Sequence, residues 1–192
     1  MVTRMVRLLT ISGSLRRSSS NTALLQAVAL LAPADVSVRW YSELGAVPPF
    51  NPDLEGSEPK AVLDFRECLR AADVVLIASP VVSQGGAGGV INALDWVVGS
   101  GELSGKPVAI FNASPSGTLA QASLAEIIRT MDARLVANAA LALPLLGRNL
   151  DAAGIAANDE MARALRGALA AFVAEIATTD DVGTAPSTPS ID

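Results

Sequence analysis

The sequence predicts a three-layer α/β fold, in which a doubly wound, five-stranded parallel sheet of strand order 2-1-3-4-5 lies between two layers of helices. Three observations predict it. Five short apolar segments alternate with five helical patterns along the chain. Three of these segments are nearly continuous in Val, Ile, Leu, Ala and Phe, which is typical of parallel strands buried on both faces. The length of 192 residues and the apolar content of 51% suit one domain with a well-buried core.

The five apolar segments are the expected strands. They are residues 6–11, 36–41, 74–78, 108–112 and 135–143. The second segment, Val36-Ser37-Val38-Arg39-Trp40, alternates apolar and polar residues and is therefore expected near the edge of the sheet. In a sheet of this order, ligands bind outside the carboxyl ends of the first and third strands, where the winding direction reverses. The loops that follow Ile11, Ala78 and Asn112 are therefore the expected binding loops.

The helices are expected between these strands, in segments whose Ala-rich composition favours helix. They are residues 22–31, 60–71, 90–98, 119–131 and 158–176. Asp159 and Glu160 suit the positive end of the dipole of the last helix. We expect residues 1–177 to form the domain and the Thr-, Ser-, Pro- and Asp-rich segment 178–192 to be a disordered tail.

Composition excludes several classes of function. The net charge of −5 argues against nucleic-acid binding, which needs a basic face. The chain has no histidine, so Ser-His-Asp catalysis, Cys-His catalysis and histidine metal ligands are excluded, and no metal site is expected. The single cysteine, Cys68, is expected to be a small core or surface residue. No segment reaches the roughly 20 apolar residues that span a bilayer, and no secretory signal is evident, so a soluble, cytoplasmic protein is expected.

The first binding loop has the features of an anion site. It reads Gly13-Ser14-Leu15-Arg16-Arg17-Ser18-Ser19-Ser20-Asn21 and leads directly into a helix, whose free N–H groups attract phosphate. The serine hydroxyls can donate to phosphate oxygens, and Arg16 can add a charge-assisted, bidentate contact. Neither GxxxxGK[ST] nor GxGxxG is present, so one terminal phosphate suits the loop better than a pyrophosphate. A solvated Ser-rich helix cap is the alternative interpretation.

Three motifs in this order carry a resemblance to a known family. The opening Ile11–Asn21, which contains Gly-Ser-Leu-Arg-Arg-Ser-Ser-Ser-Asn, resembles the GSLRxxSxN start of the NADPH-dependent FMN reductase family. The block Asn92-Ala93-Leu94-Asp95-Trp96, followed by Leu103–Val108 and then Ala113-Ser114-Pro115, also agrees with the family pattern. The resemblance extends over roughly residues 6–176. It implies a flavodoxin-like fold, bound FMN, and two-electron reduction by NADPH or NADH.

The resemblance also implies which residues would hold FMN. Residues expected at the phosphate end are Ser14, Arg16, Ser19 and Asn21. Residues expected around the ring are Pro80, Val81, Val82, Ser83, Gln84, Ser114, Ser116 and Gly117. Relatives of this type pass electrons to a small-molecule acceptor such as a quinone or free flavin, and form homodimers or homotetramers. Trp96 is expected in the core or at a subunit interface, and the interface is favoured because the family dimerises through the helix that carries this residue. Arg66, Glu67 and Arg70 are expected to form a solvated helix face.

The second loop departs from the family pattern. Val81, Val82 and Ser83 stand where the family usually has Glu, Tyr and Asn, so an aromatic contact near the flavin is lost. The backbone N–H groups of Ser83 and Gln84 can still contact the flavin, since such contacts need no particular side chain. Two alternatives to an FMN-dependent NAD(P)H oxidoreductase therefore stay open. One is a flavodoxin-type electron carrier without turnover of NAD(P)H, and the other is a family member with weakened FMN binding.

Overall fold

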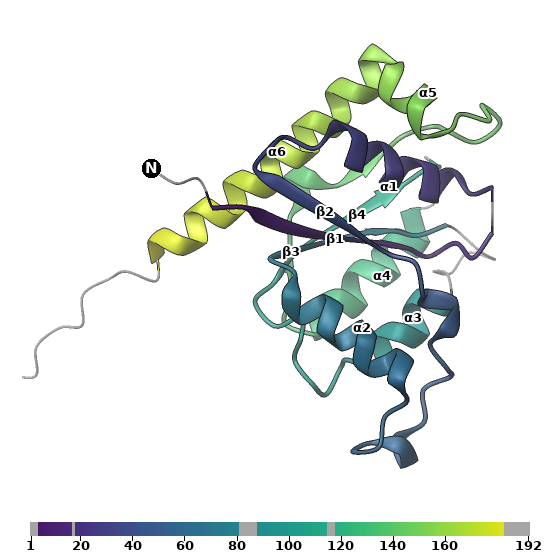
Figure 1. Ribbon diagram of the computed structural model, residues 1–192, viewed down its shortest axis with the longest axis vertical. Helices are drawn as coiled ribbons and strands as arrows, with labels where there is room; N and C mark the ends of the chain where they lie inside the picture. Colours follow the sequence, from purple (N-terminus) through teal and green to yellow (C-terminus); the bar gives the residue numbers. More distant parts are fainter. Residues whose placement is uncertain (1–3, 17, 81–87, 115–117, 183–192) are drawn as a thin grey trace, which may run out of the picture.

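The alternation of apolar segments and helical patterns determines the architecture seen in a computed structural model, which describes residues 4–16, 18–80, 88–114 and 118–182 (Figure 1). The strands are β1 (Val6–Ser12), β2 (Val36–Tyr41), β3 (Val74–Ala78), β4 (Pro107–Asn112), β5 (Arg134–Leu135) and β6 (Leu141–Ala142). The α-helices are α1 (Ser20–Leu31), α2 (Lys60–Ala71), α3 (Gly88–Asp95), α4 (Thr118–Thr130), α5 (Ala152–Ala157) and α6 (Asp159–Val182). Short 3₁₀ helices are η1 (Leu44–Ala46), η2 (Pro52–Leu54) and η3 (Ala137–Ala139).

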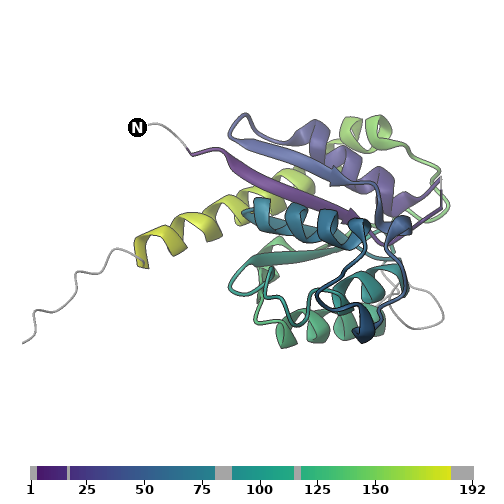
Figure 2. The same ribbon diagram turned by 60° about the horizontal axis from the view of Figure 1, so that its bottom comes forward.

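The sheet is parallel and its order is β2-β1-β3-β4-β5, which confirms the predicted order 2-1-3-4-5. The edge position expected for residues 36–41 is also confirmed. Helices α1, α5 and α6 cover one face of the sheet, and α2, α3 and α4 cover the other (Figures 1 and 2). The winding therefore reverses between β1 and β3, as the ligand-binding hypothesis requires.

The two cores follow from the alternation of side chains along each strand. On β1, Leu8 faces the α1 layer, whereas Leu9 and Ile11 face the α2 layer. All five residues of β3 are buried, as expected for a strand covered on both faces. The start of β1 and the C-terminal end of α6 lie at the same end of the sheet, opposite the ligand loops (Figure 2). No helix within the described ranges is long and apolar enough to cross a membrane.

The fifth strand differs from the prediction of a continuous strand over residues 135–143. The structure has two short pieces instead, β5 beside the start of β4 and β6 beside its end, separated by η3. The apolar run is explained by packing rather than by pairing, because Ala139 in η3 is fully buried in the core beneath α6. The spacing of apolar residues alone does not distinguish a paired strand from an irregular segment that is buried in the core.

The C-terminal segment also differs at its boundaries. Helix α5 was not expected, although Asp151 caps it by accepting a hydrogen bond from Gly154 N at 2.7 Å. Helix α6 begins with Asp159 and Glu160 in its first turn, as expected. It continues to Val182, past the domain boundary placed at residue 177. The rest of the expected tail, residues 183–192, lies outside the described residues.

Trp96 lies in the core of its own chain, which is one of the two positions expected, and not at the favoured subunit interface. Its side chain is 1% exposed, and its indole N–H donates to the carbonyl of Pro48 at 2.8 Å. The ring of Phe50 meets the indole edge to face, with centroids 5.1 Å apart. A fully buried indole has no surface left for a partner, so the interface prediction is wrong for this residue.

The helix face on α2 is solvated only in part. Glu67 and Arg70 are exposed as expected, but the Arg66 side chain is 13% exposed. Arg66 donates to Glu58 Oε1 at 2.7 Å and to the carbonyl of Trp96 at 2.8 Å. It therefore joins three segments, which corrects the prediction of a solvated side chain. Cys68 is buried, which agrees with the core position, one of the two positions expected for it.

Asp73 provides a pH-dependent anchor between β1 and β3, at the end of the sheet opposite the ligand loops. The Arg7 side chain donates to both carboxylate oxygens, through Nε at 3.0 Å and Nη2 at 2.8 Å. The backbone N–H of Arg7 at 2.8 Å and Arg4 Nη2 at 2.9 Å donate as well. The hydrogen bonds from Arg7 lower the pKa of Asp73 from 3.8 to about 2. Because the folded pKa is depressed, the stabilisation is present above pH 4 and is lost as the pH falls toward 2.

We expect Asp73→Asn to reduce the free energy of unfolding at pH 7 by roughly 1–2 kcal/mol, after allowing for solvent screening of the exposed arginines. Below pH 2 the two proteins are expected to be equally stable. Urea unfolding between pH 7 and pH 2 measures this. A constant difference across that range would show that the Asp73 carboxylate does not carry the effect.

Candidate functional site

The three expected ligand loops meet at the carboxyl edge of the sheet. The N–H of Gly13 donates to the carbonyl of Ala78 at 2.8 Å, which joins the first loop to the end of β3. The side-chain oxygen of Asn21 accepts a hydrogen bond from the N–H of Ala113 at 3.1 Å, which joins α1 to the loop after β4. These contacts span 65 and 92 residues of sequence, so the sheet order brings the loops together.

Hydroxyl groups shape the first loop. Ser19 is the N-cap of α1, and its Oγ accepts from Thr22 N at 3.3 Å. The Ser12 and Thr22 hydroxyls are 2.8 Å apart, and Ser12 Oγ also accepts from Ser14 N at 3.3 Å. Ser14 Oγ in turn accepts from Arg16 N at 3.4 Å. Because Ser14 and Ser19 use their oxygens as acceptors here, their O–H groups can still donate to a ligand.

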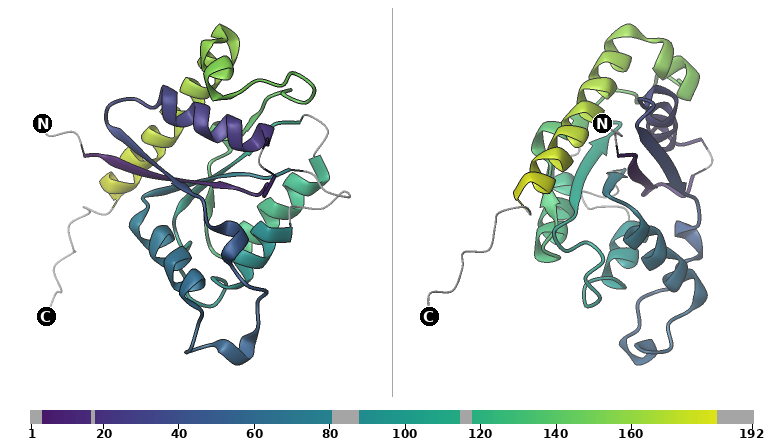
Figure 3. Two further views of the ribbon diagram at one scale, coloured as in Figure 1. Left: turned by 45° about the vertical axis from the view of Figure 1, so that its right-hand side comes forward. Right: turned by 60° about the vertical axis from the view of Figure 1, so that its left-hand side comes forward.

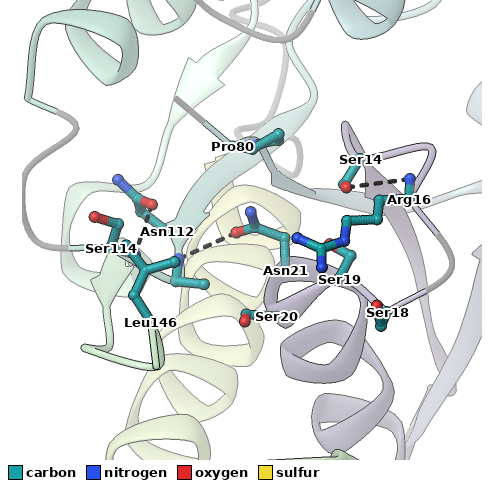
Figure 4. Close-up of a pocket in the computed structure, with 11 residues that line it drawn as sticks. Ser14, Arg16, Ser18, Ser19, Ser20, Asn21, Pro80, Asn112, Ser114 and Leu146 are labelled. Atoms are coloured by element: carbon teal, nitrogen blue, oxygen red, sulfur yellow. Dashed lines mark hydrogen bonds between the residues drawn. The ribbon is translucent and has the colours of Figure 1, made fainter. Parts of the chain in front are cut away.

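A cavity of about 430 Å³ lies where the loops meet (Figure 4). Its lining residues are Ser14, Arg16, Ser18, Ser19, Ser20, Asn21, Pro80, Asn112, Ala113, Ser114 and Leu146. Six residues predicted to contact the flavin are therefore brought together: Ser14, Arg16, Ser19, Asn21, Pro80 and Ser114. The other predicted residues, Val81, Val82, Ser83, Gln84, Ser116 and Gly117, lie outside the described residues.

Arg16 supplies the positive charge of the cavity. Its side chain is exposed, and none of the carboxylates in the described ranges forms an ion pair with it. Figure 4 shows the guanidinium pointing back over the start of α1, toward Ser19 and Asn21. The N-terminus of α1 adds partial positive charge at the same place, with no acidic residue in its first turn. The cavity is thus locally cationic in a chain of net charge −5.

Asn112 is a site residue that the sequence reasoning did not select. It ends β4 and is 1% exposed, and its Oδ1 accepts from Ser114 N at 2.9 Å. Its Nδ2 is buried and finds no hydrogen-bond acceptor within the part of the chain that the structure describes. An unsatisfied buried amide costs about 1–3 kcal/mol, which a ligand acceptor in the cavity would recover. In the sequence, Asn112 could have been recognised as a single polar residue at the end of an otherwise apolar strand.

Leu146 also lines the cavity and was not foreseen. It comes from the loop between β6 and α5 and is 65% exposed. This loop lies beside the start of α1 (Figure 3). No local pattern marks Leu146, because its position depends on how the chain returns after β6.

The cavity fits the phosphate and the adjoining polar part of a flavin mononucleotide. Charge-assisted donation from Arg16, several serine hydroxyls and the helix N-terminus match a phosphate dianion. The buried Asn112 amide is a further donor near the ends of β3 and β4, where a ligand in this class of sheet extends. The fold and the cavity together define a flavodoxin-like protein whose first loop suits an anion.

The chain belongs to the NADPH-dependent FMN reductase family, whose model matches residues 6–146. An NAD(P)H-dependent FMN reductase of Pseudomonas aeruginosa is 41% identical over 112 residues, which are 57% of this chain and 60% of the relative. A quinone reductase of Escherichia coli K12 is 30% identical over 138 residues, 68% of this chain and 73% of the relative. The match thus spans less than two thirds of the length of the Pseudomonas relative.

Solved structures agree with the fold. FerB of Paracoccus denitrificans, described as a flavoenzyme NAD(P)H:(acceptor) oxidoreductase, superposes with a TM-score of 0.73 at 26% identity, covering 90% of this chain and 98% of that one. An archaeal flavodoxin superposes with a TM-score of 0.59 at 15% identity, covering 90% and 99% of the two chains. The flavodoxin-like fold and the family implied by the three sequence motifs are therefore confirmed.

Proposed function

We propose that this chain is an FMN-dependent NAD(P)H oxidoreductase that passes electrons to a quinone or to free flavin. The observation that carries the proposal is the convergence of Arg16, the loop serines and Asn112 on one cavity. A flavin bound there supplies two-electron redox chemistry between NAD(P)H and the acceptor. The chain needs no histidine for this, since its own task is binding and orientation.

Each described residue has a role in this proposal. Arg16, Ser14 and Ser19 hold the phosphate, with the N-terminus of α1 behind them. Asn21 is a positioning residue, because its side chain holds the N–H of Ala113 and so fixes the loop after β4. Asn112, whose Nδ2 has no acceptor among the described residues, donates to the ligand. Pro80 and Ser114 flank the ring, together with the residues expected at 81–84, 116 and 117.

The relatives support the choice of acceptor. Another relative is a 2-hydroxy-1,4-benzoquinone reductase of Burkholderia, which is 34% identical over 112 residues. Together with the Escherichia coli quinone reductase, it favours a planar, apolar acceptor that stacks on the flavin. We further propose a cytoplasmic homodimer or homotetramer in which residues 1–177 form the catalytic domain.

The test is an absorbance spectrum of the purified protein titrated with FMN, followed by anaerobic addition of NADPH or NADH. We expect the flavin bands to shift on binding and to bleach with about one equivalent of the reductant. Absence of binding would contradict the proposal. Binding without bleaching by either reductant would instead favour the electron carrier.

A further inference from the structure

A second cavity, of about 390 Å³, lies at the end of the sheet opposite the ligand loops (Figure 2). It forms where the start of β1, the end of α2, the segment before β4 and the start of β5 meet. The charged side chains that line it are Arg4, Arg7, Arg70, Lys106, Arg134 and Asp73. Arg134 pairs with Glu175 at 3.0 Å, and the two are about equally exposed, so this pair adds no net charge. Cations still outnumber acids on the cavity wall, in a chain of net charge −5.

Buried carboxylates hold the exposed guanidinium groups of this cavity. Asp73 accepts from Arg4 and Arg7, and its side chain is 8% exposed. Glu102 Oε1 accepts from Arg70 Nη2 at 2.6 Å, and the Glu102 side chain is 1% exposed. The three arginine side chains are each more than half exposed. The acids therefore fix the guanidinium groups from the protein side, and an anion that arrives from solvent meets N–H donors that are already ordered.

Two of these arginines keep N–H groups for a ligand. Arg7 uses Nε and Nη2 for the Asp73 carboxylate, so the N–H groups of its Nη1 have no acceptor within the described ranges. Arg70 uses Nη2 for Glu102, whereas its Nη1 is 4.0 Å from an oxygen of Glu67, which is beyond hydrogen-bond distance. Each arginine can thus bind its buried carboxylate and an external anion at the same time.

Lys106 is the cation of the cavity that has no carboxylate partner. Its ammonium donates to the carbonyl of Ala72, and none of the acids that the structure describes forms an ion pair with it. The side chain is half-buried, and burial lowers the pKa of Lys106, an effect that Asp73 opposes and Arg7 increases. An ammonium has three N–H donors, so burying it with one acceptor costs free energy that a bound anion recovers.

We propose that this cavity binds a soluble compound with adjacent phosphates, such as pyrophosphate or a nucleoside diphosphate, between Lys106, Arg7 and Arg70. A phosphate group offers three oxygens in different directions, whereas a carboxylate offers two in one plane, so donors from three separate segments favour phosphate. The volume is close to that of the flavin-phosphate cavity, which leaves room for a second phosphate. The site is independent of the proposed function, because the flavin loops lie at the other end of the sheet.

Chemical labelling of the wild type tests the proposal, because the chain has only two lysines, Lys60 and Lys106. Acetic anhydride modifies lysine amines, and mass spectrometry measures the rate at each one. We expect pyrophosphate, at about ten times its Kd, to slow the labelling of Lys106 roughly tenfold and to leave Lys60 unchanged. Sodium chloride of the same ionic strength is expected to change neither rate. Equal slowing by the chloride, or an unchanged Lys106 rate with pyrophosphate, would overturn the inference.

The same measurement identifies the form in which the phosphates arrive. ADP is expected to protect Lys106 as pyrophosphate does, and AMP is expected to protect it less, because it has one phosphate. Vesicles of phosphatidic acid at the same phosphate concentration are expected to leave the rate unchanged. Equal protection by AMP and ADP would contradict the need for adjacent phosphates. Protection by the vesicles alone would replace the soluble ligand with a membrane surface.

Titration calorimetry with pyrophosphate measures the affinity in the FMN-loaded protein, whose first cavity is occupied. Lys106→Met is expected to weaken binding by about 10- to 100-fold, as loss of a charged hydrogen-bond donor does. Lys106→Arg, which keeps the charge, is expected to restore most of the affinity.

Lys60→Met is the matched control, because Lys60 is exposed and pairs with Asp64 on α2. It is expected to bind pyrophosphate like the wild type, and all three variants are expected to bind FMN like the wild type. Equal losses of pyrophosphate affinity in Lys106→Met and Lys60→Met would show a general effect of charge and would overturn the inference. Failure of FMN to bind would contradict the proposed function and leave the labelling result unaffected.

Discussion

Replacing Arg16 with alanine is expected to weaken FMN binding by roughly 10- to 100-fold, while riboflavin binding changes little. Hydrogen bonds to a charged group contribute about 1.5–3 kcal/mol, and each 1.4 kcal/mol corresponds to a tenfold change in Kd. Arg16 is the guanidinium that lines the cavity, and none of the described carboxylates pairs with it. Its charge is therefore available to the phosphate, which riboflavin lacks.

Titration calorimetry with the two flavins measures this difference. Arg16→Lys is the matched variant, because it keeps the positive charge but loses the planar fork that contacts two phosphate oxygens. We expect it to fall between the wild type and Arg16→Ala for FMN. Losses of equal size for FMN and riboflavin would mean that Arg16 contacts the ring or supports the loop rather than the phosphate. The N-terminus of α1 and the serine hydroxyls would then carry the phosphate alone.

The phosphate end of the site was predictable because it is local in sequence. Ser14, Arg16 and Ser19 stand within one loop, and the loop follows a strand whose position at the winding reversal follows from the order of elements. Anion binding by a helix start requires only such short-range features. Helix α2 and strands β2 and β3 were likewise predicted to the residue, since their apolar patterns are bounded by Pro59, Pro33 and Asp73.

The rest of the site depends on contacts between distant segments, which no local pattern contains. Asn21 was expected to hold the phosphate, but its buried side chain also holds Ala113, 92 residues away. Asn112 and Leu146 reach the cavity only because β4 lies next to β3 and the chain returns beside α1. The break in the fifth strand has the same origin, since Ala139 is buried by α6 and not by strand pairing.

One family motif turns out to hold a loop in place. Asn92 donates through Nδ2 to the carbonyl of Pro48 at 2.9 Å and accepts through Oδ1 from Phe50 N at 2.8 Å. Trp96, four residues later, donates to the same carbonyl. The spacing of four places both side chains on one side of α3 and its final turn. The proline-rich segment after β2 is therefore fixed against α3, the helix that follows the second ligand loop.

Trp96→Ala is expected to lower the free energy of unfolding by about 3–5 kcal/mol, the usual cost of removing a fully buried large aromatic side chain. Trp96→Phe is expected to cost less, roughly 1–2 kcal/mol, because it retains a ring against Phe50 and loses one hydrogen bond. The carbonyl of Pro48 keeps its bond from Asn92 in either variant. Urea unfolding at two protein concentrations, tenfold or more apart, measures these losses.

Comparing the loss of unfolding free energy at the two protein concentrations distinguishes a Trp96 side chain in the core from one at a subunit interface. If the indole stabilises only its own chain, the difference between variant and wild type stays constant on dilution. If it contacted a second subunit, the difference would grow at high concentration and shrink once the subunits separate. A wild-type unfolding curve retained by Trp96→Ala, together with weaker association, would contradict the core position.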